Sequence, residues 1–229
     1  VYERTKTPCN MVAGRDKTFA EALAGQSTEC PAVAVEAEHP LFILYTSGST
    51  GTPKGTCIEH RSVVRLVKNT NYIEVGPDEV FLQFAPISFD ASTLELWGPL
   101  LNGGKLVVCP AGRVSLEELG RVIRERGVTT LWLTSALFNQ MVDTEIESLR
   151  GVRQLLAGGE ALSAPHVRRM LEVIGERRLV NGYGPTENTT FSTAYEIRER
   201  RSATYPIGIA ISGTTQPGLD RDLRPVPCG

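Results

Sequence analysis

The sequence predicts an α/β protein in which helices wrap a parallel sheet. After residue 100, short apolar runs alternate with amphipathic stretches, as strands and helices do in this class. The links between these segments are short, so the parallel strands are expected to be joined by right-handed crossovers. Polar and glycine-rich residues follow several of the apolar runs, where ligands bind in open α/β sheets. The 229 residues are enough for one large domain or two small ones.

The first forty residues predict a loop-rich lead-in, because they are polar and contain several prolines. Helical periodicity is confined there to a short patch around Phe19–Leu23. The first strand is expected at Leu41–Tyr45, a wholly apolar run typical of a buried strand.

The later elements follow in regular alternation. Ser115 begins a helix with the S-x-x-E spacing of a capping box, and Gly127 ends it. Leu116, Leu119, Val122 and Ile123 share the buried face of this helix. The other expected elements are strands at Lys105–Val108, Val128–Leu133, Gln154–Ala157 and Leu179–Asn181, and helices at Ser135–Val142 and from Ser163 through Leu171, the latter stopping at Gly175.

Composition argues against several classes of protein. The 24 Lys and Arg against 26 Asp and Glu leave a net charge of −2, which does not favour nucleic-acid binding. No apolar run approaches the roughly 18 residues of a membrane-spanning helix, so no membrane partner is expected. The five cysteines form no paired motif, and their odd number favours a reduced compartment, so we expect a cytoplasmic protein. The three histidines lack the spacing of a zinc site.

The strongest chemical signal is the segment Tyr45–Gly55, where an apolar run enters a loop rich in hydroxyls and glycines. Glycines let backbone N–H groups approach a phosphate, hydroxyls donate hydrogen bonds, and Lys54 adds a positive charge. The frame of a Walker loop fails, because Pro53 precedes Lys54 and Gly55 follows it. A flexible linker is the alternative interpretation. The residues predicted to contact phosphate are Thr46, Ser47, Gly48, Ser49, Thr50 and Gly51.

This loop resembles the signature of adenylate-forming enzymes, and two further motifs follow in the order of that family. Phe89–Ser92 is similar to the substrate motif of the amino-acid-activating adenylation domains of nonribosomal peptide synthetases. Asn181–Glu187 resembles the N-x-YGPTE motif of the family, and Gly158–Leu162 resembles its adenine-side loop. The resemblance therefore implies ATP and Mg²⁺ as cofactors.

The resemblance divides the chain into a lead-in at 1–40, an adenylation core at 41–208 and a truncated segment at 209–229. It implies the layered α/β core of the large N-terminal part of such an enzyme. The family's Tyr-Arg-Thr-Gly-Asp motif and its mobile C-terminal domain, which bears the catalytic lysine, are absent from this sequence. We therefore expect a fragment cut at both ends. Residues before about Gly48 resemble acetyl-CoA synthetases more than peptide synthetases.

The family's motif roles map onto individual residues. Glu187 is similar to the carboxylate that holds Mg²⁺, and Thr186 to the hydroxyl beside the α-phosphate; with Lys54 they are the catalytic candidates. Tyr183 offers a flat face to adenine. Taken alone, Glu187 could be a surface carboxylate and Tyr183 a half-buried core aromatic. The other candidates for the nucleotide are Asn181, whose amide suits the adenine edge, and Gly158, Gly159, Glu160 and Gly184.

Asp90 stands among the apolar residues Ile87, Phe89 and Leu94, where a carboxylate is costly without a cation. The resemblance supplies the α-ammonium group of an amino acid as that cation. The alternative is that Asp90 caps a helix at Ala91–Leu96, and both roles could hold together.

The specificity positions of the family also map onto this chain. Bulky apolar residues dominate them and a second charge is missing, so the resemblance implies a compact aliphatic substrate such as valine. Trp132 could equally be ordinary strand core. The mapped positions are Asp90, Ala91, Leu94, Trp132, Leu156, Gly158, Gly182, Thr190 and Phe191.

The sequence thus predicts an adenylating ligase whose substrates are an amino acid and ATP. In the intact family the aminoacyl group then passes to a phosphopantetheinylated carrier protein. Two other functions remain open: a nucleotide-binding fragment without turnover, and an acyl-CoA synthetase-like ligase. An inert scaffold is the third alternative.

Overall fold

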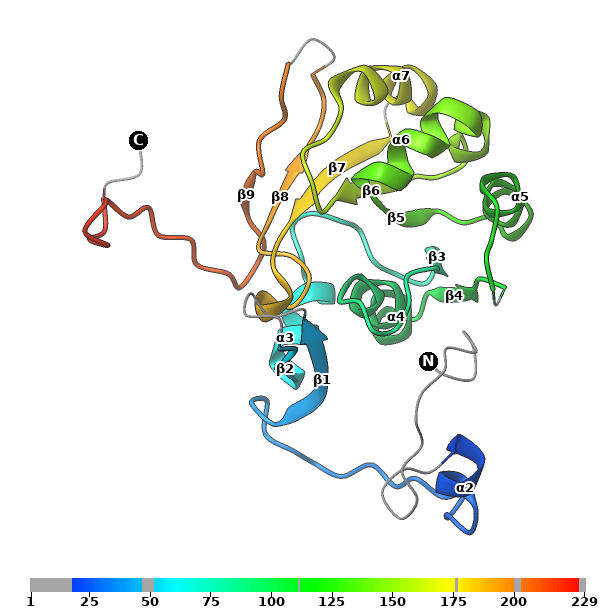
Figure 1. Cartoon of the computed structure of the whole chain (residues 1–229), viewed down its shortest axis with the longest axis vertical. Helices are drawn as coiled ribbons and strands as arrows, with labels where there is room; N and C mark the ends of the chain where they lie inside the picture. Colours follow the sequence, from blue (N-terminus) through cyan, green and yellow to red (C-terminus); the bar gives the residue numbers. More distant parts are fainter. Residues whose placement is uncertain (1–17, 47–51, 111, 176, 200–202, 227–229) are drawn as a thin grey trace.

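The computed structural model describes residues 18–46, 52–110, 112–175, 177–199 and 203–226. A seven-stranded sheet forms the centre of this part of the chain, in the order β4-β3-β5-β6-β7-β8-β9 (Figure 1). The first five strands in that order are parallel, as predicted, and the last two are antiparallel. The strands are β3 (Val80–Gln83), β4 (Lys105–Val108), β5 (Thr130–Thr134), β6 (Gln154–Gly158), β7 (Arg178–Tyr183), β8 (Thr193–Glu196) and β9 (Ile209–Ala210).

Helices cover both faces of this sheet, because successive strand residues point in opposite directions. Leu131, Leu133 and Leu155 pack in one core with helices α5 (Leu116–Arg126), α6 (Ser135–Thr144) and α7 (Ala164–Ile174). Their neighbours Trp132, Leu156 and Val180 pack on the other side, with α3 (His60–Val67) and α4 (Ala91–Asn102). The central strands are therefore buried on both faces.

The helix boundaries follow local signals in the sequence. The Ser115 hydroxyl accepts a hydrogen bond from the Glu118 N–H at 3.1 Å, which caps α5 as predicted. Gly127 ends α5 with a φ of 61°, the left-handed conformation that favours glycine. The predicted patch at Phe19–Leu23 forms helix α2, whose capping box joins Thr18 and Glu21. A 3-10 turn, η1 (Ile146–Leu149), follows α6.

The expectation of a buried strand at Leu41–Tyr45 is half wrong. A strand forms there, β1 (Pro40–Thr46), but it pairs antiparallel with β2 (Lys54–Glu59) in a separate two-stranded sheet. Ile43 is 58% exposed and Tyr45 70%, whereas Leu44 is buried. The reason is that only one face of this sheet packs on the rest of the protein, around Val63 of α3. An apolar run does not itself tell how many of its faces are covered.

None of the helices in the described ranges has the length and the apolar character needed to cross a bilayer.

Candidate functional site

The predicted site residues gather at the carboxyl ends of β5, β6 and β7. Thr134, Gly158 and Gly182 are consecutive partners there across the three strands. A Cβ atom on Gly158 would lie 2.0 Å from the Gly182 carbonyl oxygen, and one on Gly182 would lie 2.6 Å from the ring of Phe191. Only glycine fits at these two positions, because the backbone and an aromatic ring approach so closely.

The predicted apolar walls of the substrate pocket lie together beside these glycines. The rings of Trp132 and Phe191 meet edge to face, with centroids 5.0 Å apart. Trp132 is 9% exposed, so it is strand core and a neighbour of the pocket residues at once. Ala91, Leu94, Trp132, Leu156 and Phe191 all pack in the cluster on the α3 and α4 side of the sheet.

Asp90 joins this apolar cluster to the segment predicted to bind phosphate and metal. The Thr186 hydroxyl donates to Asp90 Oδ2 at 3.0 Å, and the Thr190 hydroxyl donates to the Asp90 carbonyl at 2.7 Å. Burial raises the pKa of Asp90; the hydrogen bond from Thr186 opposes this rise, and the charge of Glu187 adds to it. A half-buried carboxylate whose charge is penalised in this way favours a cationic partner.

Two expectations about Asp90 are wrong. Its side chain makes no capping hydrogen bond to α4, because its φ of −63° and ψ of −27° are already helical and its carboxylate instead accepts from Thr186. Ile87 and Phe89 do not enclose it in apolar surroundings, since both are exposed in the loop that follows β3. Leu94 is buried, as predicted.

The segment that carries the predicted metal carboxylate is a 3-10 turn, η2 (Thr186–Asn188), followed by Thr189 and Thr190. These two threonines have φ angles of 53° and 66°. β-Branched residues rarely adopt this left-handed region, and each such residue costs about 1–3 kcal/mol. Glu187 is exposed on the turn, which suits both a metal ligand and an ordinary surface carboxylate.

The phosphate loop is bounded by two paired strands. Thr46 and Lys54 are partners across β1 and β2, and Lys54 is exposed. Strand β2 contacts η2, so Lys54 and Glu187 belong to neighbouring elements. The other predicted loop residues, Ser47 to Gly51, lie outside the described residues.

On the predicted adenine side, Tyr183 is 50% exposed at the end of β7 and belongs to none of the hydrophobic clusters of the described residues. Its ring face is therefore open rather than half-buried in the core. Asn181 is buried, and its Nδ2 donates to the Pro206 carbonyl at 2.8 Å, so its amide nitrogen already holds a neighbouring segment. Gly159, with a φ of 84°, and Glu160 form an exposed turn after β6, and Gly184 lies against the backbone of Thr190.

Two residues near the site escaped the sequence analysis. Glu95 of α4 is buried, and its Oε2 accepts hydrogen bonds from the backbone N–H groups of Phe84 and Ala85 at 3.0 and 2.9 Å. Burial raises its pKa to about 8. The charged residue inside the apolar run Leu94–Trp97 was a signal for it. Arg65 of α3 reaches the backbone of residues 188–191, and its position between Val64 and Leu66 gave no signal.

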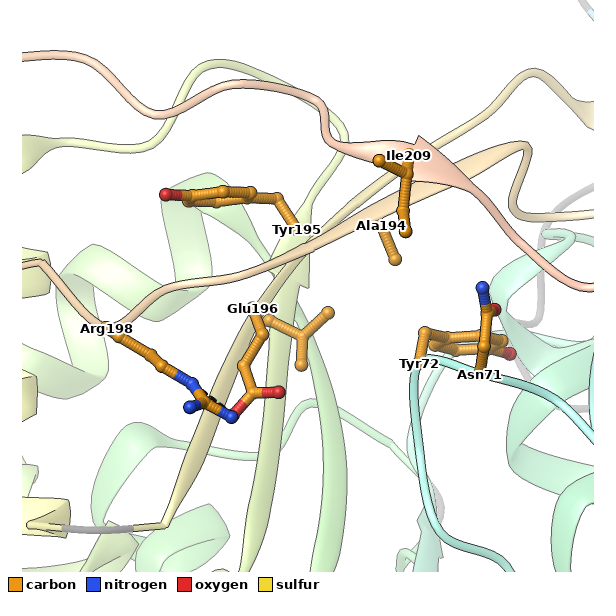
Figure 2. Close-up of a pocket in the computed structure, with 8 residues that line it drawn as sticks. Asn71, Tyr72, Ala194, Tyr195, Glu196, Arg198 and Ile209 are labelled. Carbon is orange, nitrogen blue, oxygen red and sulfur yellow. Dashed lines mark hydrogen bonds and ion pairs between the residues drawn. The ribbon is translucent and has the colours of Figure 1, made fainter.

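A separate hollow of about 410 Å³ lies over β7, β8 and β9, and contains none of the predicted site residues. Figure 2 shows Asn71 and Tyr72 facing Ala194 and Ile209 across it, with the Glu196–Arg198 ion pair at one end. The predicted chemistry lies elsewhere, at the carboxyl ends of the parallel strands.

Comparison with known proteins identifies the family. The model of a family described as AMP-binding enzyme matches residues 3–229. Two proteins of the linear gramicidin synthase of Brevibacillus parabrevis are similar to this chain. One is 51% identical over 212 residues, which are 92% of this chain and 3% of that protein. The other is 50% identical over 209 residues, which are 90% of this chain and 4% of that protein. The chain therefore spans a small part of these curated relatives.

Solved structures agree. Holo-PA1221, described as a nonribosomal peptide synthetase protein with adenylation and PCP domains, bound to a vinylsulfonamide inhibitor, matches with a TM-score of 0.83 and 38% identity over 93% of this chain and 39% of that chain. The N-terminal subdomain of Klebsiella oxytoca NpsA, in complex with 3-hydroxyanthranilyl-AMSN, matches with a TM-score of 0.81 and 31% identity over 91% of this chain and 54% of that chain. With its mostly parallel α/β sheet and its ordered motifs, the chain belongs to the AMP-binding enzyme family, among the adenylation domains of nonribosomal peptide synthetases.

Proposed function

We propose that this chain forms the site for ATP-dependent activation of a small aliphatic amino acid such as valine, in nonribosomal peptide synthesis. The observation that carries the proposal is the contact between Asp90 and Thr186, 96 positions apart in the sequence. It joins a carboxylate suited to an α-ammonium group with a hydroxyl suited to a phosphate. A site for both substrates of an adenylation reaction needs such a junction.

In the proposed reaction a carboxylate oxygen of the amino acid forms a bond to the α-phosphorus of ATP. The bond from that phosphorus to the bridging oxygen of the β-phosphate breaks, and pyrophosphate leaves with the electron pair. Asp90 binds the ammonium group and so directs the substrate carboxylate toward Thr186. Lys54 and the Thr186 hydroxyl stabilise the negative charge on the phosphates.

The residues present fit a magnesium ion that is bound together with ATP. Glu187 offers an exposed carboxylate on η2, and Mg²⁺ is usually held by one or two carboxylates and the substrate phosphates. No group of three or more His, Cys, Asp or Glu among the described residues forms a ready metal cage. When bound, the ion neutralises charge on the phosphates.

The apolar cluster around Trp132, Phe191 and Leu94 supports an aliphatic side chain, and the ring of Phe191 fills the space beside Gly182. A pocket of this kind separates substrates that differ by one methylene by about 1–3 kcal/mol. We therefore expect lower but measurable activity with isoleucine, leucine and 2-aminobutyrate. The solved relatives that join adenylation and PCP domains support a phosphopantetheinylated carrier protein as the partner that receives the aminoacyl group.

The proposal is tested by amino-acid-dependent exchange of pyrophosphate into ATP, with valine, the other aliphatic amino acids and acetate as substrates. We expect exchange with valine and its loss, by at least about 100-fold, in Asp90→Asn. The exposed Asp78→Asn is the control and should retain the activity of the parent. Calorimetry with ATP and Mg²⁺ accompanies the assay.

Each alternative has its own result. Heat on ATP binding without exchange would indicate a nucleotide-binding fragment without turnover. Acetate-dependent AMP formation that ignores valine would indicate an acyl-CoA synthetase-like ligase. No heat at millimolar ATP would leave neither function standing.

A further inference from the structure

The side chain of Arg65 reaches from α3 to the backbone that follows the predicted metal carboxylate. Its Nη2 donates to the carbonyl oxygens of Asn188 at 2.7 Å and Thr189 at 3.2 Å. Its Nη1 donates to the carbonyl of Phe191 at 3.0 Å and also bonds the hydroxyl of Thr214. One guanidinium group therefore holds three carbonyls within four consecutive residues.

Arginine suits this task because its planar group presents several N–H donors in fixed directions. Arg65 is partly buried, and burial lowers its pKa. It makes no ion pair within the described part of the chain, so its hydrogen bonds go to neutral oxygens. A lysine would carry the same charge but would present a single donor nitrogen to these separated acceptors.

The backbone that Arg65 holds is strained. Thr189 and Thr190 both have positive φ angles, and unusual conformations of this kind persist only where the surroundings over-determine them. The ends of this stretch reach both halves of the proposed site. On one side Thr186 bonds the Asp90 carboxylate; on the other the ring of Phe191 contacts Trp132 and also Tyr72, at a centroid distance of 5.6 Å.

We propose that Arg65 is a positioning residue that holds the 188–191 backbone in its strained conformation, and so sets the placement of both the Phe191 pocket wall and the Thr186–Asp90 contact. It touches neither expected substrate. Its effect on ligand binding rests on the proposed function, whereas its effect on Phe191 does not. An ordinary structural tie between α3 and the sheet would stabilise the fold without changing the surroundings of Phe191.

The test uses the 229-residue chain with Trp97→Phe, which leaves Trp132 as the only tryptophan. Arg65→Lys and Arg65→Met are compared with Arg61→Met. Arg61 is the matched control because it lies one turn earlier on α3, is 59% exposed and pairs only at the surface, with Glu38 and Glu59. Acrylamide quenching of Trp132 fluorescence reports the Phe191 contact, and far-UV circular dichroism reports the fold.

Both Arg65 variants are expected to raise the quenching constant of Trp132 about twofold with unchanged circular dichroism, and Arg61→Met to leave it unchanged. If Arg65→Met does not fold, Arg65→Lys alone decides. For a hydrolysis-resistant valyl sulfamoyl adenosine with Mg²⁺, Arg65→Lys should weaken binding about tenfold or more.

Unchanged quenching in a folded Arg65→Lys would overturn the proposal, as would a change of equal size in the Arg61 control. If the unaltered chain binds no adenylate analogue, the proposed function fails, but the quenching comparison still decides the role of Arg65.

Discussion

Glu95 makes the stability of this protein depend on pH in a direction opposite to that of most carboxylates. Its side chain is buried, and burial raises its pKa from 4.5 to about 8 despite the two backbone hydrogen bonds that favour the charged form. The contribution of Glu95 to stability is therefore fully present below about pH 4.5 and is lost as the pH rises toward 8. The reason is that the unfolded chain releases this proton in that interval and the folded chain keeps it.

The magnitude follows from the linkage relation. Each pH unit between the two pKa values costs up to about 1.4 kcal/mol, so the folded state loses roughly 3–4 kcal/mol from this group between pH 5 and pH 8. Glu95→Gln mimics the protonated carboxyl and removes the titration. We expect the variant to be close to the parent at pH 5 and more stable than it at pH 8 and above.

The assay is urea unfolding followed by circular dichroism at pH 5, 7 and 8.5, for the parent, Glu95→Gln and the exposed control Glu172→Gln. The control should track the parent at every pH. A difference between Glu95→Gln and the parent that stays constant from pH 5 to 8.5 would refute the reasoning, because it would mean that Glu95 titrates alike in the folded and unfolded states.

Three further predictions concern packing and pairing. Gly158→Ala should lower the free energy of unfolding by about 1–3 kcal/mol, because its Cβ meets the Gly182 carbonyl, whereas Gly151→Ala, whose Cβ meets nothing within 4 Å, should change the urea midpoint little. Glu79→Gln should cost about 1–2 kcal/mol, because this buried carboxylate accepts from Thr129, Thr130 and Arg153; the surface pair of Glu147 with Arg150 should contribute less than about 1 kcal/mol when Glu147→Gln is unfolded in the same way, and equal losses would contradict this ranking. Trp132→Phe should widen the proposed pocket and raise the leucine-to-valine ratio of kcat/KM about tenfold in the exchange assay, and an unchanged ratio would remove Trp132 from the pocket.

Local signals account for most of the elements that the sequence predicted correctly. Helix α5 begins at Ser115 and ends at Gly127 because the capping hydroxyl and the left-handed glycine lie within the helix's own neighbourhood in the chain. The parallel part of the sheet follows from short links between apolar runs in the same way. The motif residues of the family are also contiguous, so the sequence sufficed to name them.

Burial and partnership were harder to predict. The apolar run at Leu41–Tyr45 predicted a strand but not that Ile43 and Tyr45 would stay exposed, because pairing with a single partner strand leaves a face open. Asp90 could be expected to cap a helix or to bind a cation, and only the approach of Thr186 decided against the cap. Asn181 likewise gives its amide nitrogen to Pro206, a contact that its motif does not announce.

The sequence by itself determined the fold class, the order of the strands and helices after residue 100, and the family, because each depends on signals that lie close together in the chain. Only the tertiary structure decided that Arg65 holds the backbone of residues 188–191, that Glu95 is buried against the loop after β3, and that Asp90 meets Thr186. The physical reason is that a hydrogen bond depends on the direction and distance of two groups, and for groups far apart in the sequence these are set by the packing of the whole fold.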